Sequence, residues 1–170
     1  MGPYSMLSSK YSITGTRHRQ HGFSLLEVLI ALVVLSIGLL GLAGLQANGL
    51  KNNNSAYQRS QANLMVNEIL DRIRANRAGL AAGSYDDPFS GGTPSDPGCI
   101  SSGCTPAQLA AYDAFLWQGQ VASILPSGVG DISGSGADSV FTITIMWDDD
   151  RDGAGSDCTD LTCFIVSTRI

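Results

Sequence analysis

The residues best suited to binding a ligand form an acidic run late in the chain. Asp148, Asp150, Asp152 and Gly153 follow the pattern Asp-x-Asp-x-Asp-Gly, which is the first half of an EF-hand calcium loop. The twelfth position of such a loop carries glutamate, but here it carries Thr159, and the flanking residues have strand patterns instead of helix patterns. We therefore favour a solvated turn that faces water, with calcium binding as the competing hypothesis. No other metal or cofactor is expected.

Four cysteines form two pairs with the same spacing, Cys-x4-Cys. The pairs are Cys99 with Cys104 and Cys158 with Cys163. Zinc is the weaker interpretation, because both histidines of the chain lie within residues 1–22. An even number of cysteines in an exported segment favours disulfides. Of the three connectivities that four cysteines allow, we favour pairing within each Cys-x4-Cys unit and leave the others open.

A single carboxylate, Glu27, lies just inside a long apolar run. Residues 28–45 contain no charged side chain. At about 1.5 Å per residue in a helix, this run spans most of a ~30 Å hydrocarbon core and predicts a transmembrane helix. An ionised side chain near a bilayer centre costs roughly 3 kcal/mol. Glu27 therefore either lies at the headgroup level, stabilised by the helix dipole, or is a polar group that another subunit must satisfy.

The charge of the chain is unevenly divided. Residues 1–22 carry +3 of the formal net charge of −5, which leaves −8 for the remainder. An acidic body offers no positive surface to phosphates, so nucleic-acid binding is not expected. Positive residues before a first apolar helix keep that end in the cytoplasm, so the residues after 45 are exported. Because the exported part has no histidine and no phosphate-binding glycine motif, we predict that the protein is not an enzyme.

Four segments position these residues. The chain is predicted to begin with a cytoplasmic leader at residues 1–22. The transmembrane half of a long helix follows at 23–45, its amphipathic half at 46–78, and a globular region at 79–170. The apolar run is longer than the core of an ordinary signal peptide and lacks a small-residue cleavage site after it, which favours a retained anchor. In the second helix half, apolar residues recur at spacings of three and four, as in Ala62, Met65, Ile69 and Ile73.

The end of this helix is predicted from its last residues. Gly79 has the residue type of a helix C-cap, and arginines precede it, as the helix dipole favours. We expect one helix from about Phe23 to Ala78. The alternative is two helices broken near Asn52–Asn54.

Capping residues predict a second helix after a loop at 80–104. Thr105 fits the N-cap, Pro106 the first helical position, and Gln108 completes a capping box. The helix is expected to run to about Leu125, before a proline.

Two strands are predicted from alternating side chains. Residues 139–147 place apolar and polar side chains on opposite faces, and residues 164–170 repeat the pattern. Residues 127–136 are typical of turns, with at most one short strand. The sequence therefore predicts an α+β domain in which a helix packs on a small antiparallel sheet.

The start of the apolar run carries a resemblance to a known family. Residues 22–32, Gly-Phe-Ser-Leu-Leu-Glu-Val-Leu-Ile-Ala-Leu, resemble the class III signal sequence of type IV pilins and pseudopilins. Residues 37–46 and 104–110, together with the late Trp-Asp-Asp at 147–149, resemble the PilV-type minor pilins, or type IV pilus modification proteins. The resemblance implies the type IV pilin fold, in which a long N-terminal helix packs on a small antiparallel sheet and an αβ-loop contains a short helix.

The resemblance also implies roles for three residues. A prepilin peptidase would cleave between Gly22 and Phe23 and methylate the new amino group of Phe23. In the family, the glutamate at the position of Glu27 pairs with the N-terminus of a neighbouring subunit. Such a pair offsets the burial of both charges and fixes the subunit register.

The implied protein is a minor pilin that passes once through the inner membrane, with a cytoplasmic N-terminus and a periplasmic globular domain. It would then join the tip or priming complex of a type IV pilus at the cell surface. The implied partners are prepilin peptidase, other minor and major pilins, a pilus tip adhesin and the inner-membrane assembly platform. The implied roles are pilus assembly, cell adhesion and twitching motility. The alternatives are a type II secretion minor pseudopilin and a membrane-anchored calcium-binding or adhesive module that never polymerises.

Overall fold

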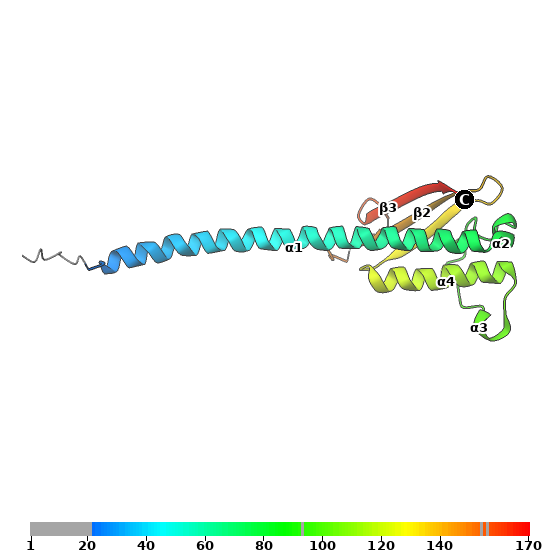
Figure 1. Ribbon diagram of the computed structural model, residues 1–170, viewed down its shortest axis with the longest axis horizontal. Coiled ribbons are helices and arrows are strands. Elements are labelled where there is room, and N and C mark those ends of the chain that lie inside the picture. The colour runs from blue at the N-terminus through cyan, green and yellow to red at the C-terminus, as the bar shows by residue number, and fades with distance from the viewer. Residues whose placement is uncertain (1–21, 93, 154, 156) are drawn as a thin grey trace, which may run out of the picture. The chain divides into compact units, whose positions relative to one another are not determined.

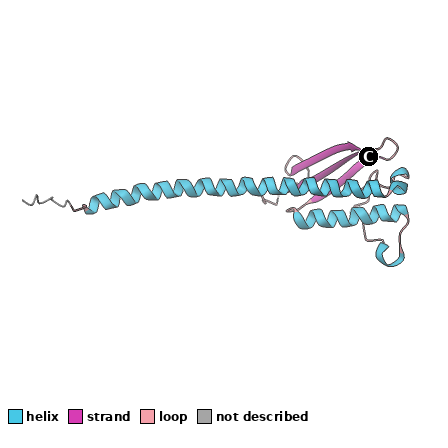
Figure 2. Cartoon of the chain, viewed as in Figure 1, coloured by secondary structure: helices cyan, strands magenta, loops and turns pink. Residues whose placement is uncertain are grey.

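The computed structural model of the protein describes residues 22–92, 94–153, 155 and 157–170. The chain divides into two units, residues 1–46 and 47–170. The described elements, most of them labelled in Figure 1 and all coloured by type in Figure 2, are α1 (Leu25–Ala75), α2 (Arg77–Ala81), α3 (Cys99–Ser102), α4 (Pro106–Ile124), β1 (Val129–Ser135), β2 (Val140–Trp147) and β3 (Thr162–Arg169). A long N-terminal helix and a small antiparallel sheet confirm the predicted α+β fold.

Helix α1 begins directly after Ser24. The N–H of Glu27 donates to the Ser24 side-chain oxygen at 3.1 Å, so Ser24 satisfies one of the amides that a helix start leaves unpaired. The helix continues without a break through Asn52–Asn54, so the alternative of two helices there is wrong. Its most apolar 18-residue window has a mean hydropathy of 2.8 and none of it is buried, which makes α1 long and apolar enough to cross a membrane.

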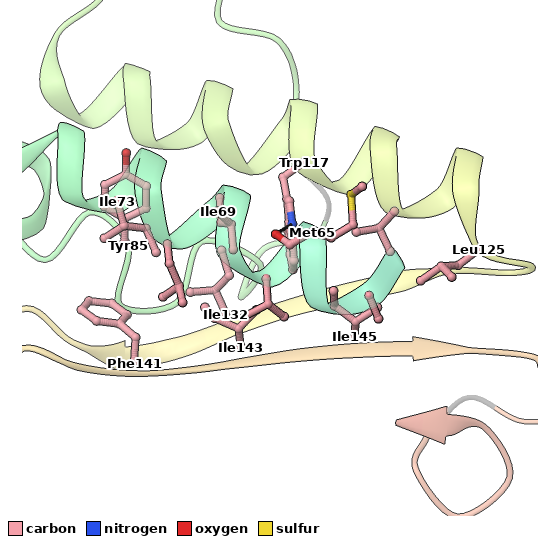
Figure 3. Close-up of a cluster of buried hydrophobic side chains, with 14 of the residues drawn as sticks. Met65, Ile69, Ile73, Tyr85, Trp117, Leu125, Ile132, Phe141, Ile143 and Ile145 are labelled. Atoms are coloured by element: carbon pink, nitrogen blue, oxygen red, sulfur yellow. Dashed lines mark hydrogen bonds between the residues drawn. The ribbon is translucent and has the colours of Figure 1, made fainter. Parts of the chain in front are cut away.

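The second half of α1 supplies one side of the core of residues 47–170. Its buried side chains recur at helical spacing: Gln58, Ala62, Met65, Val66, Ile69, Leu70 and Ile73. The sheet has the antiparallel order β1-β2-β3. Figure 3 shows Met65, Ile69 and Ile73 lying over the apolar side chains of the sheet. The predicted inner face of the second strand is confirmed, because its four side chains are fully buried: Phe141, Ile143, Ile145 and Trp147.

Two tryptophans attach the surrounding elements to α1. Trp117 of α4 donates its indole N–H to the backbone oxygen of Met65 at 2.9 Å. Trp147 of β2 donates to the Gln58 side-chain oxygen at 3.0 Å, and both residues are buried. Each contact combines a large apolar ring with a satisfied donor. They fix α4 and the sheet to the helix, and Figure 1 shows α4 running alongside it.

The start of α4 has the capping residues that the sequence predicts. The Thr105 side chain accepts from the N–H of Gln108 at 3.2 Å, while the Gln108 side chain accepts from the N–H of Thr105 at 3.0 Å. This reciprocal pair is the predicted capping box, followed by Pro106 in the first turn. The helix ends at Ile124, one residue from the expected end.

The predicted C-cap at Gly79 is wrong. Helix α1 ends at Ala75, and Asn76 begins the separate short helix α2, in which Gly79 is buried. The N–H of Gly79 donates to the Asn76 side-chain oxygen at 3.1 Å, and a Cβ on Gly79 would lie 2.5 Å from Asn76 Nδ2. Glycine is therefore needed here for close approach to a capping asparagine. The expected loop at 80–104 also contains the end of α2 and the short helix α3.

Candidate functional site

The N-terminal site is built from the first residues of α1. Phe23 is 82% exposed, and it shares a shallow surface depression with Glu27, Val28, Ala31, Leu32 and Leu35. Glu27 lies in the first turn of α1, where the unpaired N–H groups of a helix favour a negative charge. Because Phe23 and Glu27 line the same depression, they lie toward the same side of the chain. The site thus presents a carboxylate beside the residue that the sequence predicts as the new N-terminus.

Glu27 has no countercharge within its own stretch of chain. It is the single charged residue between positions 22 and 46. The large apolar side chains around it are exposed, from Leu25 at 84% to Leu45 at 72%. Such a surface requires lipid or other apolar helices around it. A cation that neutralises Glu27 in those surroundings must therefore come from outside residues 22–46.

The four cysteines form two disulfides, which confirms the prediction of disulfides. Cys99 is bonded to Cys104 and Cys158 to Cys163, the connectivity that the spacing favoured. The first bond encloses α3 and ends directly before the N-cap of α4, and the second closes the turn that leads into β3. These sulfurs are consequently not available as thiolate ligands for zinc.

The acidic run between β2 and β3 brings three carboxylates together. One oxygen from each of Asp148, Asp150 and Asp152 lies within 4.8 Å of the others. The expectation that the whole run faces water is wrong at Asp148, which is 5% exposed. Its two carboxylate oxygens accept the backbone N–H groups of Arg151 at 2.7 Å and Gly153 at 3.0 Å.

These backbone donors explain why the pKa of Asp148 is lowered. The N–H of Gly153 is the largest influence that holds the pKa of Asp148 below its usual value, and the N–H of Arg151 acts in the same direction. The carboxylate of Asp148 thus organises its own turn. Calcium binding at this cluster stays a prediction.

Sequence reasoning missed a buried polar network that connects α1, the following loop and α4. The Tyr85 hydroxyl donates to Asp113 Oδ2 at 2.6 Å, and Asn76 Nδ2 donates to the Tyr85 oxygen at 3.1 Å. Arg72 contacts Asp113 at 3.4 Å and Glu68 at 2.7 Å. Burial, followed by the bond to Asp113, raises the pKa of Tyr85.

Arg72 is charged at the edge of this network. Burial alone lowers the pKa of its guanidinium, but Glu68 and then Asp113 outweigh that effect and raise it. Of the bonded pairs, only Glu68 and Arg72 have a helical spacing, four residues apart, whereas the bonds of Tyr85 join residues 9 and 28 apart along the chain. Its geometry is that of a structural connection, with every member satisfied by a neighbour.

Two family models match adjoining parts of this chain. Residues 17–43 match the prokaryotic N-terminal methylation motif, and residues 44–115 match the family of type IV pilin Tt1218. The protein is a type IV pilin. No curated protein and no solved structure matches the chain.

The type IV pilin assignment explains which processing and assembly steps involve the N-terminal site. Pilins are structural, non-enzymatic proteins, and a pilin with this motif is processed by prepilin peptidase and assembles with other pilins. The apolar start of α1 is the membrane anchor typical of the class. The matched residues end at 115, so β1, β2 and β3 lie beyond both matches.

Proposed function

We propose that this pilin is a minor pilin of a type IV pilus, of the PilV type. It is inserted once in the inner membrane with its N-terminus in the cytoplasm and residues 79–170 in the periplasm. Cleavage between Gly22 and Phe23 and methylation of Phe23 release it for incorporation into the pilus. The observation that carries this proposal is the isolated Glu27, the fifth residue after the cleavage site and the single charged residue of the apolar stretch 22–46.

The exposure of the site supports the proposed cleavage step. Gly22 and Phe23 precede the first helical turn and are exposed, which supports access of a protease to the peptide bond between them. A Cβ on Gly22 would meet no atom within 4 Å. A larger residue at this position therefore acts on the fit of the peptidase and leaves the fold of the pilin unchanged.

Replacement of Gly22 by alanine tests this step. We expect the Gly22→Ala pilin to remain uncut in cells that express prepilin peptidase, visible on a gel as a band about 2 kDa heavier, the mass of a leader of ordinary composition. Gly49→Ala is the matched control, because a Cβ there also meets no atom within 4 Å. Normal processing of the Gly22→Ala pilin would contradict the assignment of residues 1–22 as a leader.

The role of Glu27 is to neutralise a buried amino terminus during assembly. After cleavage, Phe23 carries a cation, and methylation keeps that charge. Burying the cation among apolar helices without a partner costs roughly 3 kcal/mol, which corresponds to more than tenfold in an equilibrium constant. Glu27 thereby fixes the position of this subunit relative to its neighbour.

Glu27→Gln separates assembly from processing. We expect it to be cleaved normally but to be recovered at least about tenfold less in sheared pilus fractions. Lys51→Gln, which also removes a charge from an exposed position of α1, serves as the control. Equal recovery of Glu27→Gln and the wild type would contradict the assembly role.

The wider role is proposed as part of the tip or priming complex, with other minor pilins, a tip adhesin and the inner-membrane assembly platform. Deletion of the gene should then abolish surface piliation, adhesion and twitching motility. Loss of protein secretion with normal piliation would indicate a type II secretion pseudopilin. Absence of the processed protein from sheared pili would indicate an anchored module that never polymerises.

A further inference from the structure

Within the part of the chain that the structure describes, strand β3 has one edge with no strand beside it. It pairs with β2 on one side and is the last strand of the sheet. Ile170 N donates to Ser139 O at 2.8 Å, and hydrogen-bonded pairs alternate along an antiparallel ladder. The even-numbered residues of β3 therefore bond to β2. The backbone groups that point away from the sheet belong to Cys163, Ile165, Ser167 and Arg169.

The opposite edge of the sheet is satisfied within the chain. On β1, the outward N–H of Gly130 donates to Gln118 Oε1 at 2.8 Å, and that of Gly134 donates to Asp86 O at 2.9 Å. Among the described residues, no group outside β2 bonds to the backbone of Ile165 or Ser167. The two edges of the sheet thus differ, and the unsatisfied one is that of β3.

The β3 edge also lacks the usual protection against pairing. Edge strands are commonly blunted by proline, charged side chains or bulges. Strand β3 contains no proline, and its single charged residue is Arg169 at its end. Ile165, in the middle of the strand, is 57% exposed on the outer face. Eight residues of regular strand are therefore presented as a template for another strand.

The negative charge of the connection beside this edge favours a positively charged binding partner. The connection between β2 and β3, residues 148–161, contains six aspartates and one arginine, a net charge of −5. It leaves β2 at Trp147 and enters β3 at Thr162, and these two residues are paired. One end of the β3 edge therefore lies in a strongly negative field. A second copy of the same acidic body is disfavoured there, and a positively charged chain is attracted.

We propose that the β3 edge binds an extended segment of another protein by strand addition. Backbone hydrogen bonds to Ile165 and Ser167 hold the segment, an apolar side chain covers Ile165, and lysine or arginine at one end of the segment contacts the acidic connection. This binding site goes beyond the proposed assembly role of α1 and does not depend on it. It uses residues outside both family matches.

The test uses the full-length pilin in detergent micelles and a fluorescent peptide of sequence Thr-Val-Thr-Val-Thr-Val-Lys-Lys. We expect saturable binding below about 1 mM, measured by fluorescence anisotropy. A peptide with glutamates in place of the lysines should bind about tenfold more weakly at low salt. No binding of the lysine peptide, or equal binding of the glutamate peptide, would overturn the proposal.

Two further peptides test strand addition while leaving the protein unchanged. One carries N-methyl groups on every threonine and the other on every valine. An added strand uses the amides of alternate residues only, so one of the two peptides should bind and the other should fail. Equal binding of both would show that the backbone edge is not used.

A protein variant locates the site. Ile165→Pro removes an outward N–H without removing a bond to β2. It should therefore weaken the binding of the lysine peptide at least about tenfold. Ile165→Thr keeps the amide and should bind within about threefold of the wild type. Unchanged binding by a folded Ile165→Pro variant would overturn the proposal. If that variant fails to fold, the two N-methylated peptides decide. Self-association that is lost in Ile165→Pro would assign the edge to a second copy instead.

Discussion

The hydroxyl of Tyr85 is expected to stabilise the unit of residues 47–170 by about 2 kcal/mol. Tyr85 is fully buried, and its hydroxyl donates to Asp113 Oδ2 at 2.6 Å and accepts from Asn76 at 3.1 Å. In Tyr85→Phe, Asn76 keeps the backbone oxygen of Pro106 at 2.7 Å. Asp113 keeps only the longer contact with Arg72, at 3.4 Å. The loss is therefore one hydrogen bond to a buried carboxylate, worth roughly 1.5–3 kcal/mol.

Thermal unfolding measures this loss. For a region of this size, about 2 kcal/mol corresponds to a fall of roughly 8 °C in the midpoint. Near-ultraviolet circular dichroism of the full chain in detergent micelles follows the buried tryptophans. Tyr57→Phe is the matched control, because Tyr57 is 60% exposed. A midpoint for Tyr85→Phe equal to that of Tyr57→Phe would refute the assignment of a stabilising role to the network.

The pH dependence of the same contact has a definite sign. The pKa of Tyr85 is raised in the folded state, so folding favours the protonated hydroxyl. Its contribution is complete below the unfolded tyrosine pKa of about 10 and falls as the pH rises above that value. The midpoint of the wild type should therefore drop toward that of Tyr85→Phe in alkaline solution. A constant difference between the two proteins from pH 7 to beyond about pH 11 would contradict this explanation.

Two further predictions concern the region between β2 and β3. Replacing Cys158 and Cys163 together by serine removes a disulfide between cysteines five positions apart. The free energy of unfolding, measured by denaturant titration, should fall by about 2 kcal/mol because the unfolded chain gains freedom. An unchanged free energy of unfolding would show that the unfolded chain is already restricted there. We expect no heat of calcium binding to the full-length pilin at millimolar ion by calorimetry, because the oxygens of Asp148 already accept two backbone N–H groups. Measurable heat that disappears in Asp150→Asn would favour the calcium site instead.

Local signals predicted the elements best. The capping box of α4 involves Thr105 and Gln108, three residues apart, and its geometry depends on little else. The alternation in β2 reports one buried face, which any sheet on a helix would require. The cysteine spacing favoured pairing within each Cys-x4-Cys unit because the two partners are close along the chain.

Tertiary effects explain what the sequence did not predict. A glycine such as Gly79 serves equally as a C-cap or as space for a neighbour, and only the position of Asn76 distinguishes these roles. Asp148 has the type of a solvated loop residue, yet the turn of backbone around it buries its carboxylate. The bond between Tyr85 and Asp113 joins residue types that are ordinary individually. The N-cap at Ser24 was foreseeable, since Ser24 and Glu27 have the spacing of a capping box.

The division between matched and unmatched residues has a physical counterpart in the core. The match to the pilin family ends at residue 115, two residues before Trp117. Trp117 and Trp147 each direct an indole N–H to the second half of α1, at Met65 and Gln58, which lies within the match to the pilin family. Only the inner face of the sheet is constrained by these contacts. Ile165 on β3 lies outside these contacts and is 57% exposed, so its replacement should leave the packing of the core intact. A helix that carries assembly and a separate exposed strand edge would let one subunit assemble like other pilins and also bind a partner of its own, as the proposed strand addition requires.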